Sequence, residues 1–157
     1  MQKIVPFLWF DTQAEEAARF YTSLFPDAKI DSVTRYGEAG PGPAGAVMSV
    51  TFTLAGQDFY ALNGGTVFHF TPAISLFVNV ETQPELDALW DALADGGTPI
   101  QCGWVTDKYG LTWQIVPTAL GRLLNDPDPA KAARVMQAMM GMVKLDIASL
   151  QAAYDVG

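Results

Sequence analysis

Six side chains in this sequence could line a binding site for a small organic molecule. They are aromatic or amide residues on or beside expected strands: Trp9, Tyr60, Asn63, Phe77, Trp104 and Gln114. Aromatic walls with a few amide and hydroxyl groups suit a small, flat or amphipathic ligand. Most of these side chains could instead fill a hydrophobic core. The two amides are exceptions, because a buried amide needs a hydrogen-bond partner, which a ligand or a bridging water could supply.

The other residue types that could do chemistry are scarce. His69 is the one histidine of the chain, and a structural role competes with a role as a base. Cys102 falls in an expected strand with no histidine nearby, which favours an inert buried thiol over a nucleophile. Asp107 and Lys108 occupy an expected turn and fit turn chemistry with a surface ion pair. We therefore assign no catalytic residue, and the roles of His69 and Cys102 stay open.

An internal repeat indicates how these residues are positioned. The segment Asp11–Glu15 recurs, with the same residue types at most positions, as Glu81–Glu85. The echo extends to Phe7 and Phe77, which stand at matching positions. A repeat of this length indicates two copies of one supersecondary unit, which pair to bury a common core.

Apolar patterns predict the order β-α-β-β-β in each half. In the first half the expected strands are Ile4–Phe10, Lys29–Tyr36, Val47–Leu54 and Phe59–Leu62. In the second half, where the strands are more compressed, they are Ala73–Val80, Ile100–Val105 and Leu111–Val116. Each half has one helix after its first strand, opened by a capping box of a threonine and a glutamate three residues later: Thr12 with Glu15, and Thr82 with Glu85.

The C-terminal segment has no counterpart in the repeat. Helices are expected over Ala130–Met140 and Lys144–Tyr154, and their methionines suit either packing onto the chain's own sheet or contact with a second copy. The expected fold class is α+β: two tandem β-α-β-β-β modules forming a cupped mixed sheet, with C-terminal helices. We expect a single domain over residues 1–157, with module one at about 3–65, module two at about 70–117 and the helical extension at about 118–157.

Composition bounds the possible partners. A chain of 157 residues with 50% hydrophobic content can bury one core. Its net charge of −8 and scattered basic residues argue against nucleic acid and anionic membrane surfaces as partners. The single cysteine fits a reducing cytoplasm, and we see neither an N-terminal signal nor an apolar run that could span a bilayer. The expectation is a soluble cytoplasmic protein.

The tandem modules resemble the vicinal oxygen chelate superfamily, which includes glyoxalase I and the bleomycin resistance proteins. A more specific likeness is to its PhnB-like branch, often labelled 3-demethylubiquinone-9 3-methyltransferase domains. That likeness rests on five stretches: Phe20–Asp27, Ala61–Gly65, Phe68–Thr71, Gly103–Pro117 and Asp126–Ala132. The resemblance implies the cupped fold, but a fold does not by itself define a function.

The resemblance also allows a test for a metal site. Metal-using members of the superfamily take one ligand, usually histidine or glutamate, from each of four strands. Alignment by the repeat places these positions at Val5, Tyr60, Ser75 and Gln114, which offer no imidazole and no carboxylate. Divalent ions prefer anionic oxygen or imidazole nitrogen, so the sequence predicts no metal site and no cofactor.

Three functions follow as hypotheses. The leading one is metal-independent binding of a small organic molecule by a homodimer, in the manner of the resistance-type binding proteins. The second is a superfamily enzyme acting on an aromatic or quinone-like substrate, with Tyr60, His69 or Gln114 as the polar side chains that take part in the reaction. The third is the methyltransferase of the family label, although no strand is followed by Gly-x-Gly-x-x-Gly and a helix for an adenosyl cofactor.

Overall fold

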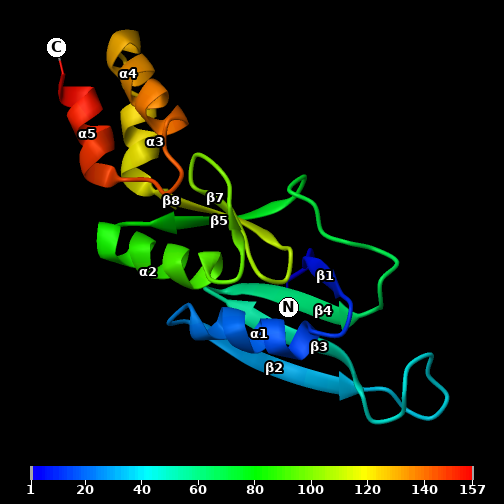
Figure 1. The fold of residues 1–157 in the computed structure, drawn as a ribbon. Coiled ribbons are helices and arrows are strands. Elements are labelled where there is room, and N and C mark those ends of the chain that lie inside the picture. The colour runs from blue at the N-terminus through cyan, green and yellow to red at the C-terminus, as the bar shows by residue number, and fades with distance from the viewer. Residues whose placement is uncertain (1, 157) are drawn as a thin grey trace. The chain divides into compact units, whose positions relative to one another are not determined.

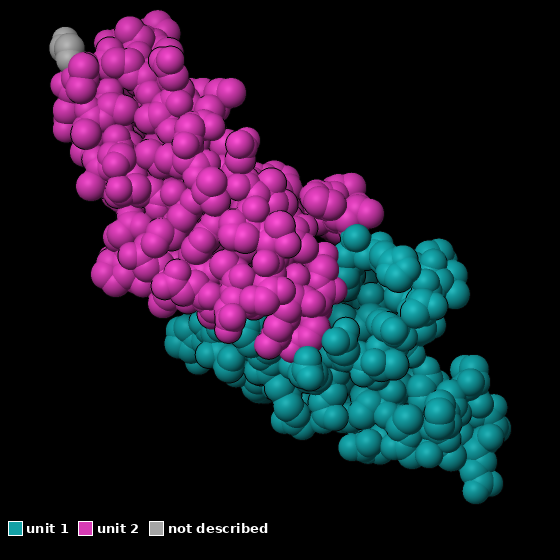
Figure 2. Space-filling view, viewed as in Figure 1, with its two compact units in different colours: residues 1–70 teal, residues 71–157 magenta. Residues whose placement is uncertain are grey.

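A computed structural model describes residues 2–156 of the protein. The chain divides into two compact units, one ending at Phe70 and the other beginning at Thr71 (Figure 1; Figure 2). That the whole chain forms a single domain stays a prediction.

The first unit is a four-stranded mixed sheet covered by one helix. Its elements are β1 (Phe7–Phe10), α1 (Ala14–Ser23), β2 (Ala28–Arg35), β3 (Val47–Leu54) and β4 (Gln57–Asn63). The strand order is β1-β4-β3-β2; β1 is parallel to β4, and the other neighbours are antiparallel. A two-residue turn, Ala55–Gly56, joins β3 to β4, as the hairpin pattern predicts.

Side-chain alternation gives this sheet a covered face and a more open one. The side of α1 that carries Ala17, Ala18 and Tyr21 is fully buried against the sheet. The rings of Phe52 on β3 and Phe59 on β4 stack beneath it, with centroids 5.3 Å apart. Because successive strand residues point to opposite faces, the residues between these buried positions lie on the opposite face, where burial is only partial.

The second unit repeats this topology and adds three helices. Its repeated elements are β5 (Ser75–Val80), α2 (Gln83–Ala94), β6 (Thr98–Pro99), β7 (Trp104–Thr106) and β8 (Thr112–Pro117), with strand order β5-β8-β7-β6. Three further helices follow in the chain: α3 (Thr118–Leu124), α4 (Pro129–Met140) and α5 (Ile147–Asp155). Figure 1 shows these three lying together beyond the end of β8.

Strand register confirms the repeat residue by residue. Phe7 on β1 lies opposite Tyr60 on β4, and Phe77 on β5 lies opposite Gln114 on β8. In both units the first strand lies parallel to the last. The predicted α+β fold with tandem β-α-β-β-β modules is therefore correct, and the modules form two four-stranded mixed sheets.

The N-terminal boundaries of the first unit differ from the prediction. Strand β1 begins at Phe7 rather than Ile4, since Pro6 has no N–H to continue the ladder. The capping box at Thr12 is wrong: α1 begins at Ala14, and its N-cap residue Gln13 makes no side-chain hydrogen bond. The corresponding cap of α2 is correct, because the Glu85 N–H donates to the Thr82 hydroxyl oxygen at 3.3 Å.

The expected strand Ile100–Val105 is correct only for Trp104 and Val105, which lie in β7. The backbone turns at residues 101–104, where the Trp104 N–H donates to the Gln101 carbonyl at 3.1 Å. Cys102 and Gly103 both have positive φ, 58° and 86°, which a strand cannot accommodate. The turn separates β6 from β7 and places Cys102 outside the regular strands.

The C-terminal helices belong to the packed part of the second unit. Val135, Leu145 and Leu150 are fully buried. Helix α4 lies where the sequence predicts it, α5 begins at Ile147 rather than Lys144, and α3 was not predicted. Contact of this segment with a second copy stays a prediction. Among the described residues, no helix has the length and apolar character needed to cross a membrane.

Candidate functional site

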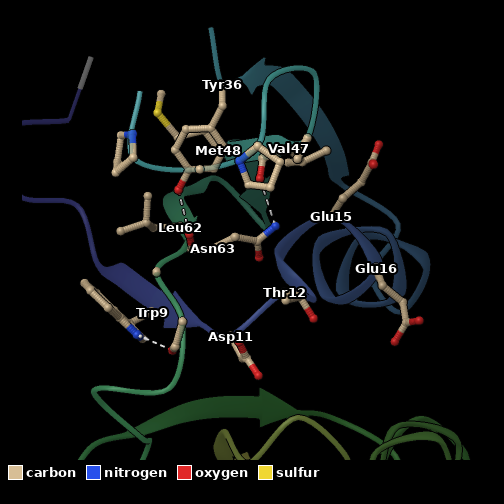
Figure 3. A pocket seen from close by; sticks show the side chains of 16 residues that line it. Trp9, Asp11, Thr12, Glu15, Glu16, Tyr36, Val47, Met48, Leu62 and Asn63 are labelled. Carbon is tan, nitrogen blue, oxygen red and sulfur yellow. Dashed lines mark hydrogen bonds between the residues drawn. The ribbon is translucent and has the colours of Figure 1, made fainter. Parts of the chain in front are cut away.

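A cavity that could hold a small molecule lies in each unit. The cavity of the first unit, about 790 Å³, lies between the loop that follows β2, the start of α1 and the end of β4 (Figure 3). Two of the predicted site residues, Trp9 and Asn63, line it. Three carboxylate residues that sequence reasoning had not assigned to a site also line it: Asp11, Glu15 and Glu16.

Two aromatic side chains of this first cavity are held by the chain itself. The Trp9 indole N–H donates to the Gly65 carbonyl at 2.9 Å, and its ring lies so close to Gly64 that a Cβ there would collide with it. The Tyr36 hydroxyl donates to the Asn63 carbonyl at 2.9 Å. The polar atoms of both aromatic side chains are thus used internally.

The Asn63 amide is also used internally. Its Oδ1 accepts a hydrogen bond from the Ala14 N–H at 2.8 Å, at the start of α1. Its Nδ2 donates to the Val47 carbonyl at 3.1 Å. The amide therefore has the partners that a half-buried amide requires, without a ligand or a bridging water.

The cavity of the second unit, about 430 Å³, brings together three of the predicted residues: Phe77, Trp104 and Gln114. These side chains come from β5, β7 and β8 and form part of the sheet surface. Other lining residues come from the helices that follow the sheet, among them Leu120 and Leu124 of α3. The cavity therefore has a sheet floor and a helical wall within one unit.

Gln114 provides an oriented polar group in this mostly apolar cavity. Its Nε2 donates to the Ser75 hydroxyl oxygen at 2.9 Å, across the parallel pair β5 and β8. This bond orients the amide, and among residues 2–156 no donor reaches Gln114 Oε1. An amide oxygen in this position can accept a hydrogen bond from a ligand hydroxyl or N–H group.

Tyr60 lines neither cavity. Its ring makes an edge contact with Phe7, with centroids 6.3 Å apart. The six predicted residues are therefore divided: two line the first cavity, three line the second and Tyr60 lies apart from both. Sequence reasoning missed the helical wall of the second cavity, although Leu120 and Leu124, four residues apart, show the spacing of an apolar helix face.

The remaining candidate groups take structural or peripheral positions. His69 is exposed and lines neither cavity, whereas Cys102 lines the second. Asp107 performs the predicted turn chemistry, and its carboxylate is buried rather than at the surface. That carboxylate accepts bonds from the Trp113 indole N–H at 2.9 Å and from the Tyr109 N–H at 2.8 Å.

The residues that the repeat predicts at the superfamily's metal-ligand positions do not fit a divalent ion. Ser75 and Gln114 hydrogen-bond to each other, and neither is an imidazole or a carboxylate. Val5 and Tyr60 add an aliphatic side chain and a phenol. Within the described chain, no group of three or more histidine, cysteine, aspartate or glutamate residues could hold a metal ion. The donor chemistry at these positions therefore gives a divalent ion only weak ligands.

Comparison with known proteins places the chain in a family. Residues 2–116 match the family model described as 3-demethylubiquinone-9 3-methyltransferase. The PhnB protein of Bacillus cereus is similar, with 43% identity over 74% of this chain and 100% of that chain, and a TM-score of 0.70. Protein PA1353 from Pseudomonas aeruginosa shares the fold at 22% identity over 74% of this chain and 98% of that chain, with a TM-score of 0.62.

No curated protein matches the sequence. The match of the family model to most of the chain, together with the identity to the PhnB protein, confirms the predicted family. The chain belongs to the PhnB-like family described as 3-demethylubiquinone-9 3-methyltransferase.

Proposed function

We propose that this protein binds a small, mostly apolar organic molecule in the cavity of the second unit, without a metal ion. The observation that carries the proposal is the Gln114 amide, which Ser75 orients at 2.9 Å while the amide oxygen stays available. The aromatic side chains of Phe77 and Trp104 line the same cavity. A flat apolar ligand with one hydrogen-bond donor matches these groups.

The first cavity fits this proposal less well, although it is larger. Its predicted amide, Asn63, is engaged with Ala14 and Val47. Carboxylates of Asp11, Glu15 and Glu16 line it, so a neutral apolar ligand would lie next to charged groups that prefer water.

The enzyme hypothesis draws less support from the geometry. Of the three polar side chains that this hypothesis assigns to the reaction, only Gln114 lines one of the two cavities, whereas Tyr60 and His69 line neither. The printed family description names a methyltransferase, so S-adenosylmethionine is the compound that separates this activity from simple binding.

Thermal unfolding with and without ligand tests the proposal. A suitable probe is 2-naphthol, which is planar and apolar and carries one hydroxyl donor. A ligand that binds only the folded state stabilises it by about 2.7 kcal/mol at a hundred times its Kd. We expect 2-naphthol to raise the Tm and S-adenosylmethionine to leave it unchanged. Stabilisation by S-adenosylmethionine alone would favour the methyltransferase.

Two matched variants locate the binding site. Gln114→Ala changes the second cavity, and Met48→Ala changes the lining of the first. We expect the first variant to reduce the shift caused by 2-naphthol and the second to leave it unchanged. The opposite pattern would move the site to the first cavity. Elemental analysis of the purified protein tests metal independence, and stoichiometric zinc, nickel, manganese or iron would contradict it.

The cytoplasmic location and the homodimer are further parts of the proposal. The single cysteine, which forms no disulfide, supports a reducing compartment. Two exposed methionines on α4, Met136 and Met140, support contact with a second copy, because apolar side chains gathered on one helix favour an interface. Light scattering after size-exclusion chromatography distinguishes a dimer from a monomer, and cell fractionation tests the location.

A further inference from the structure

The helical wall of the second cavity lies outside the region that defines the family. The family model ends at residue 116, whereas α3 begins at Thr118. The match to the Bacillus cereus protein covers all of that chain but only 74% of this one. Six of the twelve residues that line the cavity lie beyond residue 116: Pro117, Thr118, Leu120, Gly121, Leu124 and Met139. Half of the lining is therefore supplied by a segment outside the family model.

The connection between α4 and α5 is held firmly against the repeated part of its unit. The N–H groups of Cys102 and Gly103 donate to the carbonyls of Met142 and Val143 at 2.9 and 2.8 Å. Leu145, two residues further along, is fully buried. These consecutive backbone bonds attach this connection to the turn between β6 and β7, and α4 precedes it directly.

A second attachment comes from α2. The Gln83 amide nitrogen donates to the Leu145 carbonyl at 3.1 Å, and its oxygen accepts from the Ile147 N–H at 2.8 Å. One side chain thus bonds to the backbone on both sides of Asp146. Because the connection is held at several points, the end of α4 that carries Met139 is fixed beside the cavity.

Gly121 is an exposed position on the part of α3 that lines the cavity. It lies within α3 and lines the cavity, and a Cβ built on it would meet no atom within 4 Å. Glycine within a helix costs about 1 kcal/mol relative to alanine. The backbone at this position does not require glycine, and a larger side chain here would extend into the open space that borders the cavity.

We infer that Gly121 determines the size of the ligand, and that the cavity selects planar molecules of about two fused rings with one hydrogen-bond donor. The inference rests on the proposed function and deepens it. An engineered cavity of about 150 Å³ in another protein holds one benzene, so 430 Å³ accommodates a bicyclic molecule. A large side chain at position 121 would occupy part of that volume, so it should weaken the binding of a two-ring ligand more than the binding of a single ring.

Calorimetric titration with phenol and 2-naphthol tests this inference. Wild-type protein is expected to bind 2-naphthol more tightly than phenol. Gly121→Phe should weaken 2-naphthol binding at least tenfold and phenol binding less than threefold, and Gly121→Ala should have an intermediate effect on 2-naphthol. Arg122→Leu is the matched control, because Arg122 is the next residue of the same helix, is exposed and does not line the cavity; both affinities should stay within twofold.

The outcomes separate this inference from the proposed function. If wild-type protein binds neither compound, the proposed function fails and the size limit fails with it. If wild-type protein binds 2-naphthol and Gly121→Phe binds it equally well, only the size limit is wrong. An equal loss of both ligands in Gly121→Phe, with full binding in Gly121→Ala, would also contradict a size limit. Thermal unfolding checks folding, and the Tm of Gly121→Ala should not fall, since alanine favours the helix.

Discussion

Asn63 at the end of β4 caps α1 from outside the helix, because its Oδ1 accepts a hydrogen bond from the Ala14 N–H at 2.8 Å. The strand registers and the repeat place Pro117 and Pro84 at the equivalent positions of the second unit. Pro84 has no N–H to donate, and Pro117 has no side-chain acceptor. Both partners of the bond are therefore replaced together, and α2 is capped by its own Thr82.

The two caps predict different effects of mutation in the two units. Replacing Asn63 with alanine removes the acceptor for Ala14 and the donor to Val47, so the free energy of unfolding should fall by about 1–3 kcal/mol. Thr12→Ala is the control and should change it by less than about 0.5 kcal/mol, since Thr12 makes no capping bond. Urea denaturation measures both. A larger effect at Thr12 than at Asn63 would contradict the assigned cap.

The pairing of Gln114 with Ser75 predicts a graded loss of ligand binding. Gln114→Ala removes the acceptor offered to the ligand, and a hydrogen bond of about 0.5–1.5 kcal/mol corresponds to a roughly two- to tenfold rise in the Kd for 2-naphthol. Ser75→Ala keeps that acceptor and removes only its orienting partner, so a smaller rise is expected. Calorimetric titration measures both, and unchanged binding in Gln114→Ala would refute the polar contact.

The lack of space around Gly103 predicts that an added methyl group would lower the free energy of unfolding substantially. A Cβ at Gly103 would lie 2.9 Å from Leu145 Cδ1 and 3.0 Å from the Ile115 carbonyl oxygen. Gly45 has the same φ of 86° but open space around the added carbon, so it isolates the cost of the backbone conformation. We expect Gly45→Ala to cost about 1 kcal/mol and Gly103→Ala to cost at least about 1 kcal/mol more. Equal costs in urea denaturation would show that the side chains around Gly103 rearrange to accept the methyl group.

The bond between Tyr154 and Asp126 predicts a pH-dependent contribution to stability. The Tyr154 hydroxyl donates to the Asp126 carboxylate at 2.7 Å. This bond, helped by the Asp128 N–H, holds the pKa of Asp126 below its ordinary value. The same bond, with some help from burial, raises the pKa of Tyr154 above its ordinary value.

The directions of the Asp126 and Tyr154 pKa shifts define the pH range in which this hydrogen bond stabilises the folded protein. The Asp126 contribution is present above the unfolded pKa of aspartate, roughly 4, and is lost as the pH falls through the lower folded value. The Tyr154 contribution is present below the unfolded pKa of tyrosine, roughly 10, and is lost as the pH rises through the higher folded value. The Tm difference between wild type and Tyr154→Phe should be largest between these limits and shrink beyond both. A difference that does not vary with pH would refute the contact.

Contacts between residues close in the chain account for what could be predicted. The alternation in β3 and β4, the Ala55–Gly56 turn and the Thr82 cap each depend on residues a few positions apart, and all three agree with the structure. The repeat adds strand equivalence, because two copies of one unit must pair their strands in the same way. The fold class and the family could therefore be recognised from residue order alone.

Contacts between distant segments account for the rest. Asn63 and Ala14 are 49 positions apart in the sequence. Only the folded structure therefore shows that the Asn63 amide caps a helix and does not depend on a ligand for its hydrogen bonds. Five of the six aromatic and amide residues are divided between two cavities, and this division follows from the loops and helices that enclose each sheet surface. Local patterns specify elements, whereas a cavity is formed by the surfaces left between them. For that reason, only the folded structure shows that α3 and α4 line the cavity beside Gln114. The open space at Gly121 is likewise a property of the folded structure.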